Sequence, residues 1–102
     1  MDCDVLMVNN YGPAFTGESV RREGVGGSEL EIVQIAEVLA SRGHRVIVAN
    51  GVGSAVESHG VKYIPFALSA GLRAHALYIE RGTVPPDNIH ANRIVVRATD
   101  IM

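Results

Sequence analysis

The hydrophobic residues of this chain gather in short runs that alternate with one clear helical pattern. Apolar residues dominate 3–9 (CDVLMVN), 45–50 (RVIVAN) and 61–66 (VKYIPF). Continuous apolar runs of this length, bounded by turn residues, are typical of parallel strands that are buried on both faces. We therefore predict three strands, and Pro65 marks the end of the third because proline cannot donate to a ladder.

Residues 28–42 have the periodicity of an amphipathic helix. Its apolar positions form one stripe that should lie on a sheet: Ile32, Val33, Ile35, Ala36, Leu39 and Ala40. Ser28 and Glu31 have the spacing of a capping box, and Gly43 stands where a left-handed C-terminal cap belongs. A strand, a helix and a strand in this order predict a right-handed β-α-β crossover with parallel strands.

The remaining pattern is weaker. The glycine-rich segment 51–60 predicts no more than a helical turn or two. Apolar residues at helical spacing (Leu68, Leu72, Ala76 and Ile79) predict a second helix from about 69 to 81. Residues 87–91 (DNIHA) form a fourth, weak strand, since Asn88 is a poor strand former. Residues 93–102 fit either a helix or a strand, and we favour a helix because the two element types alternate up to that point.

This order predicts an α/β fold with a three-layer, Rossmann-like parallel sheet of about four strands. With 102 residues, 47% of them hydrophobic, the chain 1–102 is expected to be a single domain. A net charge of -2 gives no basic surface for nucleic acid. Cys3 is the only cysteine, which fits a reducing, cytoplasmic compartment. No apolar run reaches the roughly 20 residues of a membrane span, so any membrane contact is expected to be peripheral.

The first candidate site is the long polar loop 10–27, which follows the first strand. In parallel sheets, ligands bind at the carboxyl ends of strands. Gly24, Gly26 and Gly27 end this loop at the start of a helix, where bare amides and the helix dipole favour an anion. The alternative is that the glycines only permit a turn. A dinucleotide fingerprint is not met, because the glycine spacing is wrong and Asn50 stands where an acidic residue belongs.

Two stretches, GGSELEIVQIAEVLASRGHRVIVANG and PPDNIHAN, carry a family resemblance. Their motifs G-G-x-E, R-G-H-x-V-x-V and D-x-x-H resemble the N-terminal domain of retaining glycosyltransferases of family 4 (group 1), and the match covers nearly the whole chain in order. The resemblance implies half of a GT-B fold. It also implies transfer of a sugar from a nucleotide-sugar donor to an acceptor hydroxyl, with this domain forming the acceptor side of the cleft. Because no donor-binding second domain follows, we expect a truncated domain that is inactive alone.

The resemblance assigns roles to particular residues. Gly26, Gly27 and Glu29 match positions near the donor diphosphate, although Glu29 can equally complement the helix N-terminus. His90 matches the histidine that ends the fourth strand and faces the cleft, so it is the candidate catalytic residue; its alternative is a structural role.

The acceptor-binding candidates are Tyr11, Arg21 and Arg22 in the long loop, with a solvated surface loop as the alternative. The acceptor is a glycan, a lipid or a small molecule. His44 is expected to be structural, and His59 and His75 lack metal-ligand spacing, so no metal or other cofactor is expected. Exposed sheet edges would allow a homodimer.

Two other functions fit the same pattern. The first is a non-catalytic α/β module that binds a phosphate ligand or has a regulatory role. The second, half of a nicotinamide-dependent oxidoreductase, is disfavoured by Asn50 and by the glycine spacing.

Overall fold

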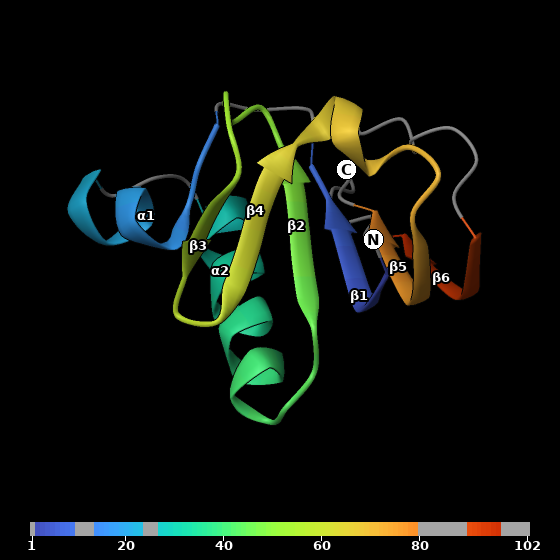
Figure 1. The fold of residues 1–102 in the computed structure, drawn as a ribbon. Helices are drawn as coiled ribbons and strands as arrows, with labels where there is room; N and C mark the ends of the chain where they lie inside the picture. Colours follow the sequence, from blue (N-terminus) through green and yellow to red (C-terminus); the bar gives the residue numbers. More distant parts are fainter. Residues whose placement is uncertain (1, 10–13, 24–26, 80–89, 97–102) are drawn as a thin grey trace, which may run out of the picture.

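Six strands form one sheet in which only one strand runs against the others (Figure 1). The computed structural model describes residues 2–9, 14–23, 27–79 and 90–96. The strands are β1 (Asp2–Val8), β2 (Val46–Asn50), β3 (Val56–Ser58), β4 (Val61–Pro65), β5 (Arg73–Ile79) and β6 (His90–Val96). Their order across the sheet is β3-β4-β2-β1-β5-β6. The short strand β3 is antiparallel to β4, and the other neighbours pair in parallel.

Two α-helices lie within the described residues, α1 (Gly17–Glu23) and α2 (Gly27–Ser41), together with the short 3-10 helix η1 (Phe66–Ser69). Helix α2 covers one face of the sheet, behind β2 and β4 in the view of Figure 1, and α1 packs beside it. None of the helices in the described part of the chain has the length and apolar character needed to cross a membrane.

The C-terminus of α2 is closed by the motif that its sequence predicts. Gly43 has a φ of 93°, in the left-handed region. The backbone N–H of Gly43 donates to Ala40 O at 3.0 Å, and that of His44 donates to Leu39 O at 3.2 Å. These two bonds form a Schellman motif, which satisfies carbonyls that the helix leaves without partners. The chain then turns directly into β2.

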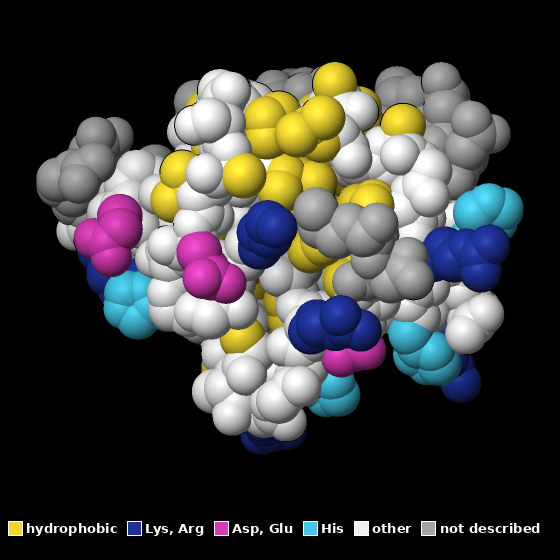
Figure 2. Space-filling model, in the orientation of Figure 1, with side chains coloured by type: hydrophobic (Ala, Val, Ile, Leu, Met, Phe, Trp, Pro, Cys, Tyr) yellow, Lys and Arg dark blue, Asp and Glu magenta, His cyan; other side chains and the backbone are white. Residues whose placement is uncertain are grey.

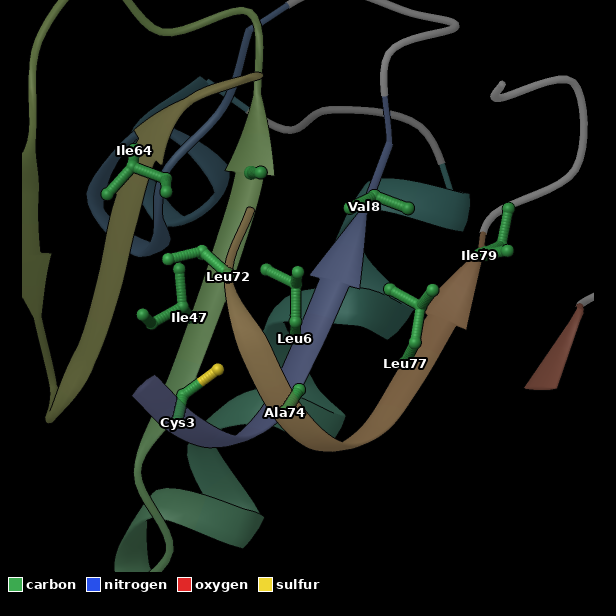
Figure 3. Packing of buried hydrophobic residues seen from close by; sticks show 10 residues of the cluster. Cys3, Leu6, Val8, Ile47, Ile64, Leu72, Ala74, Leu77 and Ile79 are labelled. Carbon is green, nitrogen blue, oxygen red and sulfur yellow. The ribbon is translucent and has the colours of Figure 1, made fainter. Parts of the chain in front are cut away.

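The sheet carries a hydrophobic cluster on each face. The cluster under α2 consists of Met7, Phe15, Ile32, Val33, Ala36, Val46, Val48, Val61 and Tyr63. The cluster on the other face is shown in Figure 3 and consists of Cys3, Leu6, Val8, Ile47, Ala49, Ile64, Leu72, Ala74, Leu77 and Ile79. Cys3 packs there as a small apolar residue, as the sequence indicates. Burial on both faces explains why β1 and β2 are almost continuously apolar.

The first strand, the main helix, the second strand and the strand at 61–66 are confirmed with small changes at their ends. Two segments differ from expectation. The stretch 10–27, predicted as a loop, contains α1. The stretch 51–60, predicted to be no more than a helical turn or two, contains β3, because His59 and Gly60 take positive φ values of 52° and 81° and form a tight hairpin turn into β4.

The helix predicted from about 69 to 81 is wrong, because residues 73–79 form β5. Ala76 and Leu77 are good helix formers, but here their backbone pairs with β1 on one side and β6 on the other. The last strand also differs: it spans 90–96, so the helix favoured for 93–102 is wrong over 93–96. Residues 80–89 and 97–102 lie outside the described part of the chain.

The fold is thus mixed α/β with a mostly parallel sheet, as predicted, and it has six strands instead of about four. Among the described residues, α2 covers one face, whereas the other face carries only η1 and the chain at Leu72. The full three-layer arrangement therefore stays a prediction.

Candidate functional site

The sheet order reverses at β1. From β1 the chain passes through α1 and α2 to β2 on one side, and β5 lies on the other side of β1. Helix α2 ends beside the start of β2 and runs against the strands, so its N-terminus lies at their carboxyl edge (Figure 1). Ligands of open parallel sheets bind at such an edge, where the strand order reverses. This edge is the candidate site.

Two buried asparagines end the strands at this edge. Asn9 follows β1, is 4% exposed, and its backbone N–H donates to Ala49 O at 3.0 Å. Asn50 ends β2 and is fully buried. Its Nδ2 donates to Phe15 O at 2.9 Å, and its Oδ1 accepts from the backbone N–H of Val52 at 2.9 Å. Asn50 therefore fixes the segment that enters α1, which is a structural role. In a dinucleotide site an acidic residue that binds the ribose would stand at this position.

Helix α1 begins with a reciprocal cap. The Thr16 Oγ1 accepts from the Ser19 backbone N–H at 3.2 Å, and the Ser19 Oγ accepts from the Thr16 backbone N–H at 2.7 Å. This is a capping box in which serine replaces the usual Glu or Gln. The spacing Thr-x-x-Ser in T-G-E-S is the sequence signal that could have located α1.

Helix α1 is held to α2 by an ion pair. Arg21 donates to both carboxylate oxygens of Glu37, at 2.9 and 2.5 Å, and also to Gly17 O at 3.1 Å. The hydrogen bond from Arg21 is the main cause that lowers the pKa of Glu37. His59 lies on the same carboxylate, with its Nδ1 3.8 Å from Glu37 Oε2. Arg21, an acceptor-binding candidate, thus has a partner within the protein.

The predicted diphosphate site is described in part. Gly26 lies outside the described residues, and Gly27 is the first residue of α2. Glu29 lies in the first turn of α2 and is partly buried. No hydrogen bond or ion pair joins its carboxylate to another described residue. Of the remaining acceptor candidates, Tyr11 lies outside the described residues, and Arg22 lies in α1 with its side chain undescribed.

His90 lies away from this edge. It was expected to end the fourth strand, but it is the first residue of β6, with its backbone N–H donating to Leu72 O at 3.1 Å. Because β6 runs parallel to β5, the start of β6 lies at the amino edge of the sheet. A strand of seven residues spans roughly 20 Å. The predicted position of His90 in the cleft with Gly27 is therefore wrong.

The other histidines have local partners. His44 Nδ1 lies 3.8 Å from Asp4 Oδ2 at the turn into β2, which agrees with a structural role. His59 Nδ1 contacts Ser58 Oγ at 3.0 Å, and His75 Nδ1 contacts Asn92 Nδ2 at 3.2 Å. Within the described residues, no group of three or more His, Cys, Asp or Glu side chains is arranged to hold a metal ion.

The described residues form a mixed α/β fold with a mostly parallel sheet. Comparison of the chain with protein-family models, with curated proteins and with solved structures finds no match.

Proposed function

We propose that this chain is the acceptor-side domain of a glycosyltransferase that uses a nucleotide-sugar donor. The observation that carries the proposal is the placement of the G-G-x-E motif: Gly27 begins α2 at the carboxyl edge of the sheet, where the strand order reverses at β1. Free amides at a helix start bind phosphate oxygens, and glycine lets them approach closely.

The environment of Glu29 supports this proposal. Glu29 is partly buried, and its carboxylate has no charged partner among the described residues. It lies in a first helical turn, which favours a negative charge. A carboxylate beside a diphosphate-binding site can accept hydrogen bonds from the hydroxyl groups of a sugar. Asn9 and Asn50, buried at the ends of β1 and β2, give this edge of the sheet a fixed backbone.

The chemistry follows from binding and from charge stabilisation. The leaving diphosphate is stabilised by amides at the helix start and by cationic groups of a donor-holding second domain, and the acceptor hydroxyl is placed against the anomeric carbon. No nucleophilic side chain of this chain is required. His90 has no part in the step, since it lies at the opposite edge of the sheet. A cytoplasmic location belongs to the same proposal, because nucleotide-sugar is the substrate.

The second candidate is a non-catalytic module that binds a phosphate ligand. The position of His90 favours it, because a cleft without that histidine lacks the one side chain to which the family resemblance gave a catalytic role. The two candidates share the helix-start site and differ in whether a sugar is recognised.

The test is a titration of the labelled chain with UDP and with UDP-glucose, followed by amide NMR. The transferase proposal predicts saturable shifts at Gly27, Ser28 and Glu29 with both probes, and tighter binding of UDP-glucose. The variant Glu29→Gln should abolish the preference for UDP-glucose, while Glu57→Gln, an exposed carboxylate on β3, should leave it unchanged. Equal binding of the two probes favours the module, and the absence of shifts in α2 contradicts both candidates.

A further inference from the structure

A second recess lies at the amino edge of the sheet, away from the candidate site. It is an open groove of about 730 Å³, lined by Cys3, Arg73, Ala74, His75, His90, Ala91 and Asn92. These residues come from the starts of β1, β5 and β6. Figure 2 shows histidine and basic side chains together on this side of the molecule, over β5 and β6.

Strand register explains the shape of the groove. Cys3 pairs with Ala74, and Ala74 pairs with Ala91, so a row of three small residues crosses three strands. Larger residues occupy the neighbouring rows: Arg73 pairs with His90 on one side, and on the other His75 contacts Asn92. The groove lies where these rows meet at the starts of the three strands, and its volume lies in the range of small-molecule sites.

The described lining of the groove is rich in basic side chains. Its described lining contains no carboxylate. Neither Arg73 nor His90 makes an ion pair or a side-chain hydrogen bond with another residue in the described part of the chain. His75 is oriented by Asn92, whose amide nitrogen lies 3.2 Å from His75 Nδ1. The other ring nitrogen of His75, Nε2, is then the one that can contact a ligand. Arginine presents a planar fork of donors that matches phosphate, and protonated imidazoles add charge-assisted donors.

We propose that this groove binds a phosphate group of a small molecule, held by Arg73, His75 and His90. Arg73 carries a permanent positive charge and donates a pair of hydrogen bonds. Each imidazole donates a ring N–H to the phosphate; in His75 the donor is Nε2–H, because its Nδ1 lies 3.2 Å from the Asn92 amide nitrogen. The site lies at the edge opposite Gly27 and does not rest on the proposed function.

Other charged residues lie near the groove, and the nearest in the strand register is Asp2 of β1, which pairs with Arg73. On β1, Asp4 accepts the backbone N–H of Arg45 at 2.8 Å and faces His44. On β6 the nearest charge is Arg93, which is also basic. The adjoining recess, which shares Cys3, holds Glu57 and Lys62, which face each other across the β3–β4 hairpin.

The chain has an internal control for this test, because its four histidines divide equally between the groove and the rest of the surface. The ring C–H signals of all four are followed by NMR while inorganic pyrophosphate is added at pH 6.0 and constant ionic strength. The signals of His75 and His90 should shift and saturate, and those of His44 and His59 should stay in place.

Arg73→Gln should weaken the binding of pyrophosphate by roughly tenfold or more, the scale of one lost charge-assisted hydrogen bond. Arg42→Gln, an exposed arginine that follows α2, is the matched control and should bind as the parent does. Parallel shifts of all four histidines, equal effects of the two arginine variants, or the absence of saturation would overturn the proposal. Amide shifts confined to the start of α2 would overturn it too and would leave the proposed function standing. Conversely, if the amides of α2 do not shift while the ring signals of His75 and His90 shift and saturate, only the proposed function is rejected.

Discussion

At the residue scale, buried polar groups fix the loops around the candidate site. Asn50 satisfies one carbonyl and one N–H at once, at Phe15 and Val52. Replacing Asn50 with Ala leaves both backbone groups without partners and should lower the free energy of unfolding by about 1–3 kcal/mol. Asn92→Ala, an exposed asparagine on β6, is the control and should change it by less than about 0.5 kcal/mol. Urea unfolding measures both, and equal losses would contradict the role of Asn50.

Tyr63 links stability to alkaline pH. Its side chain is fully buried under α2, its ring packs edge-on against Phe15, and its hydroxyl has no hydrogen-bond partner within the described part of the chain. Burial raises the pKa of Tyr63 from 10.0 to about 12. In the unfolded chain the phenol ionises near pH 10, so stability should be lost as the pH rises from there towards 12.

The variant Tyr63→Phe isolates this effect, because it keeps the ring and removes the proton. Between pH 9 and pH 11 the parent should lose about 1 kcal/mol more stability than the variant, as expected for one linked ionisation. At pH 7 the variant should be as stable as the parent or slightly more stable, since the hydroxyl it removes is buried without a partner. Parallel pH profiles for the two proteins would contradict a raised pKa for Tyr63.

At the element scale, the C-terminus of α2 depends on one backbone conformation. Gly43 has a φ of 93°, and a Cβ added there would meet no atom within 4 Å. Gly43→Ala should therefore destabilise the protein only through backbone strain, by about 1–2 kcal/mol. Gly53→Ala is the matched control, because that glycine also has open space but lacks a positive φ, and it should be neutral or slightly stabilising. Thermal unfolding distinguishes the two.

The contact between α1 and α2 should respond to acid. Arg21 lowers the pKa of Glu37, so the stability from this pair is present above the ordinary carboxyl pKa and is lost as the pH falls through the lowered one. Glu37→Gln should reduce stability at pH 7, and the difference from the parent should shrink steadily below about pH 4.5. High salt should shrink it as well, since both side chains are partly exposed. A difference that is constant from pH 3 to pH 7 would show that the charge has no role.

The elements that sequence reasoning located are those whose local signals agree with their surroundings. In α2 the apolar stripe and Gly43 both specify one helix with one buried face, and the structure has that helix. Ile35, which was expected in the buried stripe, is 38% exposed. In β5 the local signals disagree with the surroundings of the segment. Leu72, Ala76 and Ile79 repeat at helical spacing, and alanine and leucine favour helices, but the segment lies between β1 and β6 and forms a strand. Long-range pairing overrides local propensity there, and a single sequence holds no record of that pairing.

In the candidate site, too, features set by a local pattern were predictable and features set by long-range strand pairing were not. The glycine motif at the start of α2 and the burial of Cys3 were predictable, because each depends on a local pattern. His90 was misplaced because its position depends on where the last strand begins, and the weak segment 87–91 gave no register for it. The groove of Arg73 and His75 was missed for the same reason, since it exists only when β5 is a strand beside β6.

At the scale of the whole molecule, the strand order predicts a gradient of stability across the sheet. β1 is bonded on both sides, to β2 and to β5, and carries fully buried side chains on both faces, whereas β3 and β6 end the sheet within the described residues. Ile94 and Val95 of β6 are 63% and 51% exposed. Amides in β1, β2 and the paired part of β5 should therefore exchange with solvent through the rarest openings, and those of β3 and β6 through frequent local ones.

Hydrogen exchange of the whole chain tests this gradient and the identity of β5 together. If 73–79 is the strand between β1 and β6, its amides should share the slow rates of β1, and Leu6→Ala, which removes a buried side chain from that part of the core, should accelerate both strands equally. The control Ile94→Ala lies on the exposed strand and should leave β1 unchanged. Fast exchange over 73–79 beside a protected β1 would remove β5 from the sheet, and with it the register that brings Arg73 and His90 together.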